Sequence, residues 1–341
     1  MRLIVVKMKQ NIYDFFLMKY SREKIALLMS GKASFIALFS LIIIFSFLAN
    51  NFFTLSNLTN VLDLSAILLL SATGMTFVLM LGSIDLSVEG IAGLTGIVGA
   101  LMVKNFSNSN DYGLLSVIVC VLLGAIFGLL NGIVFTKLKI PSFMTTLGLG
   151  AVATGVGVLV TKGYPVIITD VSIRELAHIK LLGGIIPLLF VIAIGMNLLI
   201  WFVSERTILG RHIMAIGGDE AIAKDLGIKI DLVKVTVFTI SGVLFGLAGM
   251  LLVAKLGAGD IRNPYGLLFD SIAASLIGGV AITGGIGKIP HAAIGAITLT
   301  ILRNGMVLLG INPYIQQSVV GTIIILTVAV TIERKKIGVI K

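Results

Sequence analysis

Charged residues are scarce in this sequence: Asp, Glu, Lys and Arg make up 12% of its 341 residues, whereas hydrophobic residues make up 57%. A soluble domain carries about 25% charged residues. The scarcity excludes an ordinary soluble domain and predicts a polytopic membrane protein. The formal net charge of +10 would indicate nucleic-acid binding only if the basic residues gathered on one face. They follow the predicted loops instead, so we expect a membrane environment and no nucleic-acid partner.

Cysteine is almost absent. Cys120 is the only one and lies in an apolar run, which excludes an intramolecular disulfide and a cysteine-based metal site. The three histidines, His178, His212 and His291, have no metal-ligand spacing. No nucleophile and base stand out as a pair. We therefore expect no metal site and no catalytic residues.

A nucleotide-binding motif is also missing. Gly287-Lys288 is the nearest candidate, but Ile282 stands where a phosphate-binding P-loop needs Gly, and Ile289 where it needs Ser or Thr. We expect no cofactor on this chain. If ATP powers transport, ATP and Mg bind to a separate subunit.

Apolar stretches fill most of the chain, and ten of them approach the roughly 20 residues that cross a bilayer. The two least regular, 86–103 and 267–284, are short and rich in glycine. The predicted fold is all-α, with about ten transmembrane helices in a permease domain over residues 33–332. The predicted spans are 33–50, 59–81, 86–103, 113–136, 142–161, 181–203, 235–255, 267–284, 289–309 and 314–332.

Basic residues are divided unequally between the two sides of this arrangement. With the N-terminus inside, 19 Lys and Arg residues lie in cytoplasmic segments and 6 lie outside, with Arg303 within a span. The positive-inside rule favours this orientation. It predicts a multi-pass protein of the cell (inner) membrane, with a basic cytoplasmic segment 1–32 and a cytoplasmic tail 333–341.

Residues 204–234 differ from the apolar sequence on both sides, because they hold ten charged residues. Gly217-Gly218 is expected to break the chain, Asp219 to cap a short helix and Gly227 to end it. Ile222 and Leu226 are four apart and share one face of this helix. A helix of about two turns is marginal alone, so we expect a partner groove to receive that face. A polar loop between two spans is the alternative.

Charged residues inside apolar spans are costly and are usually functional. Asp85 and Glu89 are four apart, which predicts one helical face; Asp270 opens a span, and Arg303 lies within another. These side chains could line a polar path. Interfacial anchoring or an internal ion pair is the alternative for each.

Five segments resemble, in order, the permease subunits of ATP-binding-cassette importers of the ribose, xylose and galactose class. LGSIDLSVEG is similar to the family's GGIDLSVGS signature, although Glu89 stands where the family has Gly. The others are GLLNGIVFTKLKIPSFMTTLG, the stretch from IMAIGGDEAIAKDLGIKIDL into the next span, FDSIAASLIGGVAITGGIGK, and ILRNGMVLLGI with the terminal span. The resemblance covers residues 55 to 330.

The resemblance implies a helical permease that carries a small polar solute inward, a monosaccharide such as ribose. It also implies a second permease copy or a homologous subunit, a cytoplasmic ATPase and an extracytoplasmic solute-binding protein. The residues matching the helix that contacts the ATPase are Asp219, Glu220, Ala221, Ile222, Lys224, Leu226 and Gly227. Those expected at the translocation path or gate are Asp85, Glu89, Asn131, Asp270, Arg303 and Asn304.

Two other classes remain open from the residues alone. A proton-coupled secondary carrier would use Asp85, Glu89 or Asp270 as its titrating group, and a membrane scaffold would transport nothing. The short helix in 204–234 favours the importer subunit, because a self-sufficient carrier has no need to present it to a partner.

Overall fold

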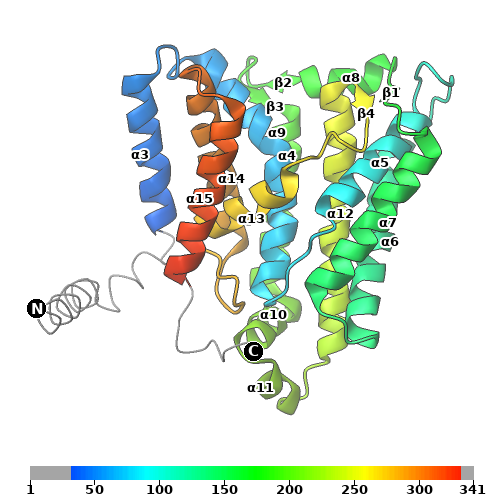
Figure 1. Cartoon of the computed structure of the whole chain (residues 1–341), viewed down its shortest axis with the longest axis vertical. Coiled ribbons are helices and arrows are strands. Elements are labelled where there is room, and N and C mark those ends of the chain that lie inside the picture. The colour runs from blue at the N-terminus through cyan, green and yellow to red at the C-terminus, as the bar shows by residue number, and fades with distance from the viewer. Residues whose placement is uncertain (1–31, 332–341) are drawn as a thin grey trace, which may run out of the picture.

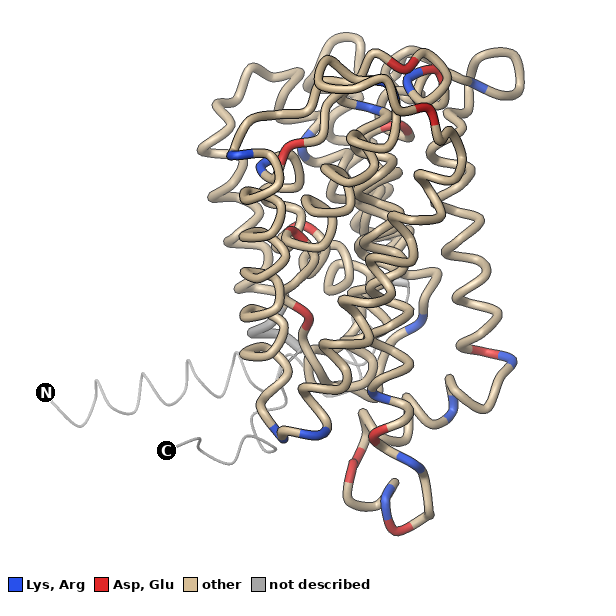
Figure 2. The backbone as a smooth tube through the Cα atoms, turned by 90° about the vertical axis from the view of Figure 1, so that its right-hand side faces the viewer, with Lys and Arg blue, Asp and Glu red and all other residues tan. Residues whose placement is uncertain are grey.

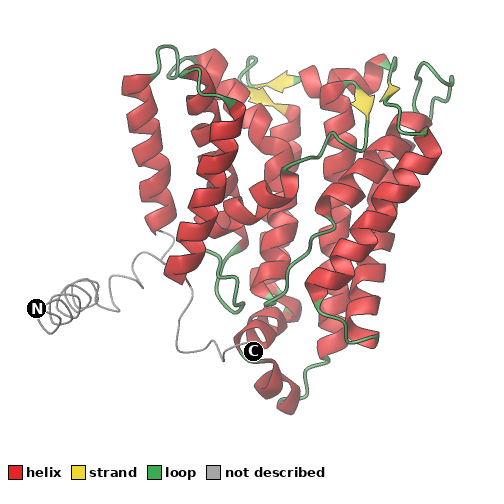
Figure 3. Ribbon diagram, in the orientation of Figure 1, coloured by secondary structure: helices red, strands yellow, loops and turns green. Residues whose placement is uncertain are grey.

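The computed structural model describes residues 32–331, and helices account for most of them (Figure 3). Inside a bilayer no water is available to the backbone, so an apolar segment satisfies its own N–H and C=O groups by forming a helix. The predicted cytoplasmic tail, and all of the predicted N-terminal segment except Lys32, lie outside the described residues.

Six of the described helices are long and apolar enough to cross a membrane. Four other helices overlap the remaining predicted spans, and crossing by ten helices stays a prediction. The six are α4 (Leu55–Met80), α6 (Leu114–Lys137), α7 (Ser142–Thr161), α9 (Leu188–Arg206), α12 (Ile230–Leu256) and α14 (Ile289–Leu308). The other four are α3 (Lys32–Leu48), α5 (Val88–Met102), α13 (Leu267–Ile277) and α15 (Pro313–Thr331).

The predicted span 267–284 is wrong beyond Ile277. The helix stops there because the chain turns at Gly278 and at Gly279, whose φ of 93° is left-handed. Residues 278–288 then follow an irregular course back to the start of α14. α13 therefore has 11 residues and ends within the bundle (Figure 1).

Short elements lie at the two ends of the bundle, and among them four two-residue strands accompany the helices of the predicted all-α fold. One end carries α8 (Val171–His178) and two antiparallel pairs, β1 (Val166–Ile167) with β4 (Ala258–Gly259) and β2 (Lys180–Leu181) with β3 (Ile186–Pro187). The opposite end carries α10 (Ile208–Gly218) and α11 (Glu220–Asp225) (Figure 1).

α12 and α4 form the centre of the bundle. α12 packs against α4, α5 and α6, while α4 also packs against α9, α13 and α14. The α6–α12 crossing is close because glycines face each other there: a methyl group on Gly124 would clash with the backbone of Gly242 and Gly246. Small residues permit such approach between membrane helices.

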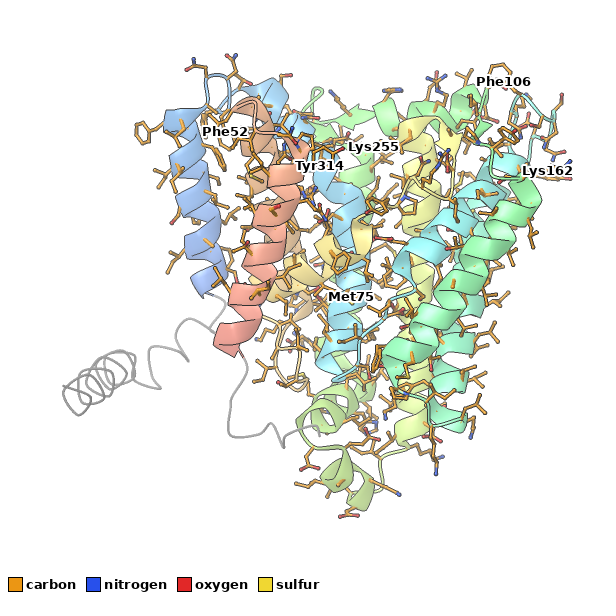
Figure 4. The ribbon with its side chains drawn as sticks, viewed as in Figure 1. Phe52, Met75, Phe106, Lys162, Lys255 and Tyr314 are labelled. Atoms are coloured by element: carbon orange, nitrogen blue, oxygen red, sulfur yellow. The ribbon has the colours of Figure 1, made fainter. Side chains whose placement is uncertain are left out.

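Charge is concentrated at the two ends of the molecule, with a few acidic positions at mid-height (Figure 2). Lys162 lies at the same end as Phe106, whereas the fully buried Met75 lies deep within α4 (Figure 4). The few charged side chains between the two ends are exceptions, and their hydrogen-bond and ion-pair partners are described below.

Candidate coupling surface and polar core

The predicted break in residues 204–234 lies at Asp219 and not at Gly217-Gly218, because both glycines belong to α10. Gly217 has a different role. A methyl group at this position would clash with the backbone of Met80 and Gly285. The glycine therefore permits α10 to approach the end of α4.

α11 begins with the side-chain cap that the sequence predicts. The Asp219 backbone is extended, and its Oδ1 accepts hydrogen bonds from the N–H groups of Ala221 at 2.9 Å and Ile222 at 3.1 Å. Capping satisfies N–H groups that have no partner within the helix. The helix of six residues thus has a defined start.

The end of α11 is equally defined. Gly227 has a φ of 79°, its N–H donates to the Lys224 carbonyl at 2.9 Å, and the Ile228 N–H donates to the Ala223 carbonyl at 3.2 Å. These two bonds form a Schellman motif, which favours glycine because of its left-handed backbone. The predicted end of the helix at Gly227 is confirmed.

An ion pair ties α11 to the long helix α12. Lys234 Nζ lies 2.8 Å from Glu220 Oε1 and 4.6 Å from the centre of the Phe135 ring on α6. Lys234 is buried, and Ala223 of α11 is buried as well. A cation between a carboxylate and an aromatic face is stabilised by both. α11 is therefore fixed to the bundle along one side.

The other side of α11 presents two apolar side chains. Ile222 is 59% exposed and Leu226 is 73% exposed. The remaining predicted coupling residues, Ala221 and Lys224, are also exposed. Ile222 and Leu226 thus form a small exposed apolar surface on a capped and anchored short helix, which we call the α11 knob.

Asp85 lies in a wholly buried polar cluster. Its Oδ1 accepts hydrogen bonds from the backbone N–H of Ser87 at 2.9 Å and from the Ser87 hydroxyl at 2.5 Å, while Ser241 Oγ of α12 lies 3.5 Å from Oδ2. Asp85 precedes α5, so the predicted helical face shared with Glu89 is wrong. The bond to the N–H two residues on forms an Asx turn, which competes with helix.

Asn131 joins this cluster from α6. Its Nδ2 donates to the Ser87 hydroxyl at 2.8 Å, and Asn131 is fully buried. The Asn131 Oδ1 atom has no hydrogen-bond partner among the described residues. The cluster thus links the start of α5 to α6 and α12.

Glu89 contacts a different helix from Asp85. Its Oε1 accepts hydrogen bonds from the backbone N–H groups of Gly266 at 2.9 Å and Leu268 at 3.1 Å. Those N–H groups belong to the first turn of α13 and its preceding residue. Glu89 therefore caps α13 from the neighbouring helix α5.

Asp270 and Arg303 form an ion pair between α13 and α14. The Asp270 Oδ1 lies 2.5 Å from Arg303 Nη2, which also lies 3.3 Å from Gln317 Oε1 on α15. The two side chains retain exposed fractions of 16% and 31%. The internal ion-pair alternative thus fits Asp270 and Arg303, although part of the pair still faces outward.

Asn304 pairs with a residue that the sequence reasoning missed. The side-chain amides of Asn304 and Asn57 donate to each other's oxygens, both at 3.0 Å. This bond ties α14 to α4. Ser87, Ser241 and Gln317 were also missed; as polar residues in or beside apolar helices, they carry only a weak signal in the sequence.

None of these clusters has the make-up of a metal centre. Across residues 32–331, no group of three or more His, Cys, Asp or Glu side chains converges. The described polar groups can hold helices together, bind a polar solute or transmit a movement.

Comparison with protein families places the chain in a known family. A family model described as "Branched-chain amino acid transport system / permease component" matches residues 57–328. The chain belongs to this family. The permease is therefore a transport subunit and not an enzyme, as the resemblance in its motifs predicts, and its apolar helices make it a multi-pass membrane protein.

Curated relatives cover most of the permease. It is 36% identical over 308 residues to the ribose import permease protein RbsC of Escherichia coli (strain K12), covering 89% of this chain and 93% of that protein. It is 34% identical over 295 residues to the probable ABC transporter permease protein YphD of the same strain, covering 86% of each. Identity to the galactose/methyl galactoside import permease protein MglC of that strain is 30% over 309 residues, covering 86% and 92%. No solved structure matches at a significant level.

These findings decide between the classes that the residues left open. Family and relatives are permease components of importers of the ATP-binding-cassette type, whose ATPase is a separate subunit. They support neither the proton-coupled carrier nor the scaffold.

Proposed function

We propose that the permease carries a monosaccharide, such as ribose or a related sugar, into the cytoplasm. An ATPase partner hydrolyses ATP with Mg, and a solute-binding protein delivers the sugar from outside. A second permease copy or a homologous subunit completes the channel. Support comes from relatives whose names specify ribose and galactose. The α11 knob carries the coupling part of the proposal.

The α11 knob is the proposed contact with the ATPase. Ile222 and Leu226 provide an apolar face for a groove, and such helix-in-groove docking buries anchors at i and i+4. The Glu220–Lys234 pair joins the knob to α12, which packs along α4, α5 and α6. A displacement of the docked knob would thus be transmitted into the centre of the bundle.

The orientation that this model needs has α10, α11 and both termini in the cytoplasm. The 19-to-6 division of basic residues supports it. In a Cys120→Ala background, a cysteine at Asn108 should react with an impermeant thiol reagent in intact cells. A cysteine at Glu220 should react only after permeabilisation. Reaction of the Glu220 probe in intact cells would reverse the orientation.

The face formed by α5, α13 and α15 is the proposed side of the solute path. Asp270 and Arg303 are partly exposed there, and charged groups that face lipid are costly. Their exposure favours a face covered by the second permease or open to a polar path. Asp85, Asn131 and Asn304 are buried in hydrogen-bonded clusters, so we propose that they position helices around this path.

Transport by reconstituted vesicles tests the function directly. The permease, its ATPase and its binding protein are placed in proteoliposomes, and uptake of labelled ribose, galactose and leucine is compared with and without internal ATP. We expect ATP-dependent ribose or galactose uptake without a pH gradient. Leucine is included because the family description names branched-chain amino acids. ATP-driven uptake of leucine alone would overturn the sugar assignment.

The α11 knob is tested by Ile222→Asp/Leu226→Asp. Charging this apolar face should lower co-purification of the ATPase by at least about tenfold, since two buried apolar anchors contribute roughly 1.5–3 kcal/mol each. Leu138→Asp/Ile208→Asp is the matched control, because both residues are similarly exposed at the same end but lie outside α11. Equal loss in the control, or none in the knob variant, would contradict the assignment.

A further inference from the structure

A basic cavity lies at the end of the bundle that carries α11. Its volume is about 960 Å³, and it lies between the end of α6, the α6–α7 loop, α11 and the start of α12. Figure 1 shows these segments meeting beside α11, and Figure 2 shows Lys and Arg positions at the same end. The cavity is distinct from the polar core around Asp85 and from the exposed face of the α11 knob.

Positive charge dominates the cavity lining, with five lysines against two acidic residues. Lys234 pairs with Glu220 at 2.8 Å, and Lys137 lies 3.9 Å from Asp231. The other three lysines form no ion pair among the described residues. They are Lys139, Lys224 and Lys229. This excess of ammonium groups favours an anionic ligand.

The lining also explains which kind of anion would fit. Apolar side chains accompany the lysines, among them Phe135, Ile140 and Leu232. A small inorganic anion would make no favourable contact with these apolar side chains. A ligand with a charged head and an apolar body would contact both parts of the lining.

An exposed apolar stripe on α6 leads to the cavity. Leu122, Ile126, Leu129 and Ile133 are each at least 39% exposed, and their spacing of three and four places them along one face. The next position of this stripe is Lys137, at the last turn of the helix. An acyl chain lying along the stripe would therefore bring its head group to the lysines.

We propose that this cavity binds the phosphate head group of an anionic phospholipid, with an acyl chain along α6. Basic pockets between membrane helices favour such head groups because charge and acyl contacts add. Glu220 and Lys234 line the same cavity. The bound head group consequently lies against the pair that holds α11 to α12.

Binding of short-chain lipids to the purified full-length permease tests the proposal. Native mass spectrometry compares dioctanoyl phosphatidylglycerol with dioctanoyl phosphatidylcholine on the wild type, on Lys139→Gln/Lys229→Gln and on a control. The control, Lys162→Gln/Lys180→Gln, removes two exposed lysines from the opposite end. We expect the wild type and control to prefer phosphatidylglycerol. The cavity variant should bind it about 25-fold more weakly, at roughly fivefold for each of the two lysines.

A variant that should bind phosphatidylglycerol more tightly controls for misfolding, because misfolding would only weaken binding. Asp231→Asn removes one acidic residue from the lining and frees Lys137, so phosphatidylglycerol should bind about fivefold more tightly. Equal binding of the two lipids to the wild type, or unchanged binding to both cavity variants, would overturn the proposal.

Two further measurements distinguish a lipid from the other possible occupants of the cavity, a free anion and the ATPase. Displacement by inorganic phosphate as effective as by phosphatidylglycerol would assign the cavity to a free anion. Loss of the co-purifying ATPase from Lys139→Gln/Lys229→Gln, with lipid binding unchanged, would assign it to the subunit interface. Either result would contradict lipid binding.

Discussion

Asp85 and Asp270 each stand near the start of a short helix inside the bundle, but the protein stabilises them differently. Asp85 is fully buried and held by the N–H and hydroxyl of Ser87. Asp270 is partly exposed and paired with Arg303. One carboxyl is a hydrogen-bond acceptor that shapes its own turn, and the other is half of a charge pair joining two helices.

The difference indicates which carboxyl depends on its charge. The hydrogen bonds to Asp85 need an acceptor oxygen, and the side-chain amide of asparagine still supplies one. The pair at Asp270 needs a negative charge, because a guanidinium cannot release its proton in a protein. Substitution by asparagine therefore separates the two roles.

Asp270→Asn should have the largest effect. It leaves Arg303 charged and without its carboxylate inside the bundle, at a cost of about 3 kcal/mol. This is the lower end for a buried pair, because Arg303 stays partly exposed. Reaction of a thiol dye with Cys120 gives the thermal midpoint, since this only cysteine is fully buried until the protein unfolds.

Matched variants test whether loss of the Asp270–Arg303 ion pair causes the lower stability of Asp270→Asn. Arg303→Gln should cost less than Asp270→Asn, because an isolated carboxyl can become neutral by binding a proton. The double variant Asp270→Asn/Arg303→Gln should recover more than half of the lost stability. A double variant as unstable as Asp270→Asn would show that the ion pair is not the source.

Apolar length and helix ends were the features best predicted from sequence. Every predicted span overlaps a helix, although 267–284 is helical only as far as Ile277, and Asp219 and Gly227 cap α11 as expected, because caps depend on local chemistry. Long-range partners could not be predicted. Spacing placed Asp85 and Glu89 on one face, but the Asx turn at Ser87 breaks that helix. Which helix approaches Glu89 or Asp270 depends on packing, which periodicity does not encode.

Glu89→Ala should have the second largest effect, because Glu89 connects the two regions. The change removes the acceptor for the N–H groups of Gly266 and Leu268, and unmet hydrogen bonds at this partly buried site should cost about 2 kcal/mol. Glu89→Gln keeps an oxygen acceptor and should cost less than half as much. The Cys120 assay measures both, and equal losses would mean that the carboxylate charge, and not the cap, is needed.

Asp85→Asn should be milder, at about 1 kcal/mol or less, because the amide oxygen can still accept both bonds from Ser87. Asp85→Ala should cost about 2 kcal/mol, since it leaves those donors unsatisfied. The same thermal assay compares them with Asp270→Asn. If Asp85→Asn destabilised the permease as much as Asp270→Asn, the contrast between the two carboxyls would be wrong.

Asp260→Asn should have the smallest effect, although Asp260 also pairs with an arginine. The Asp260 Oδ2 lies 2.7 Å from Arg262 Nη2 in the linker between α12 and α13. Hydrogen bonds from Arg262 lower the pKa of Asp260 below its usual value of 3.8. The lowered pKa stabilises the fold above pH 3.8 and this contribution is lost as pH falls through the folded-state pKa. Because the Arg262 side chain is 73% exposed, solvent weakens the pair.

At pH 7 the thermal midpoint of Asp260→Asn should therefore stay within the scatter of repeat measurements on the wild type, whereas Asp270→Asn lowers the midpoint clearly. A shift at Asp260 as large as that at Asp270 would show that burial does not set the cost of losing an Asp–Arg pair here.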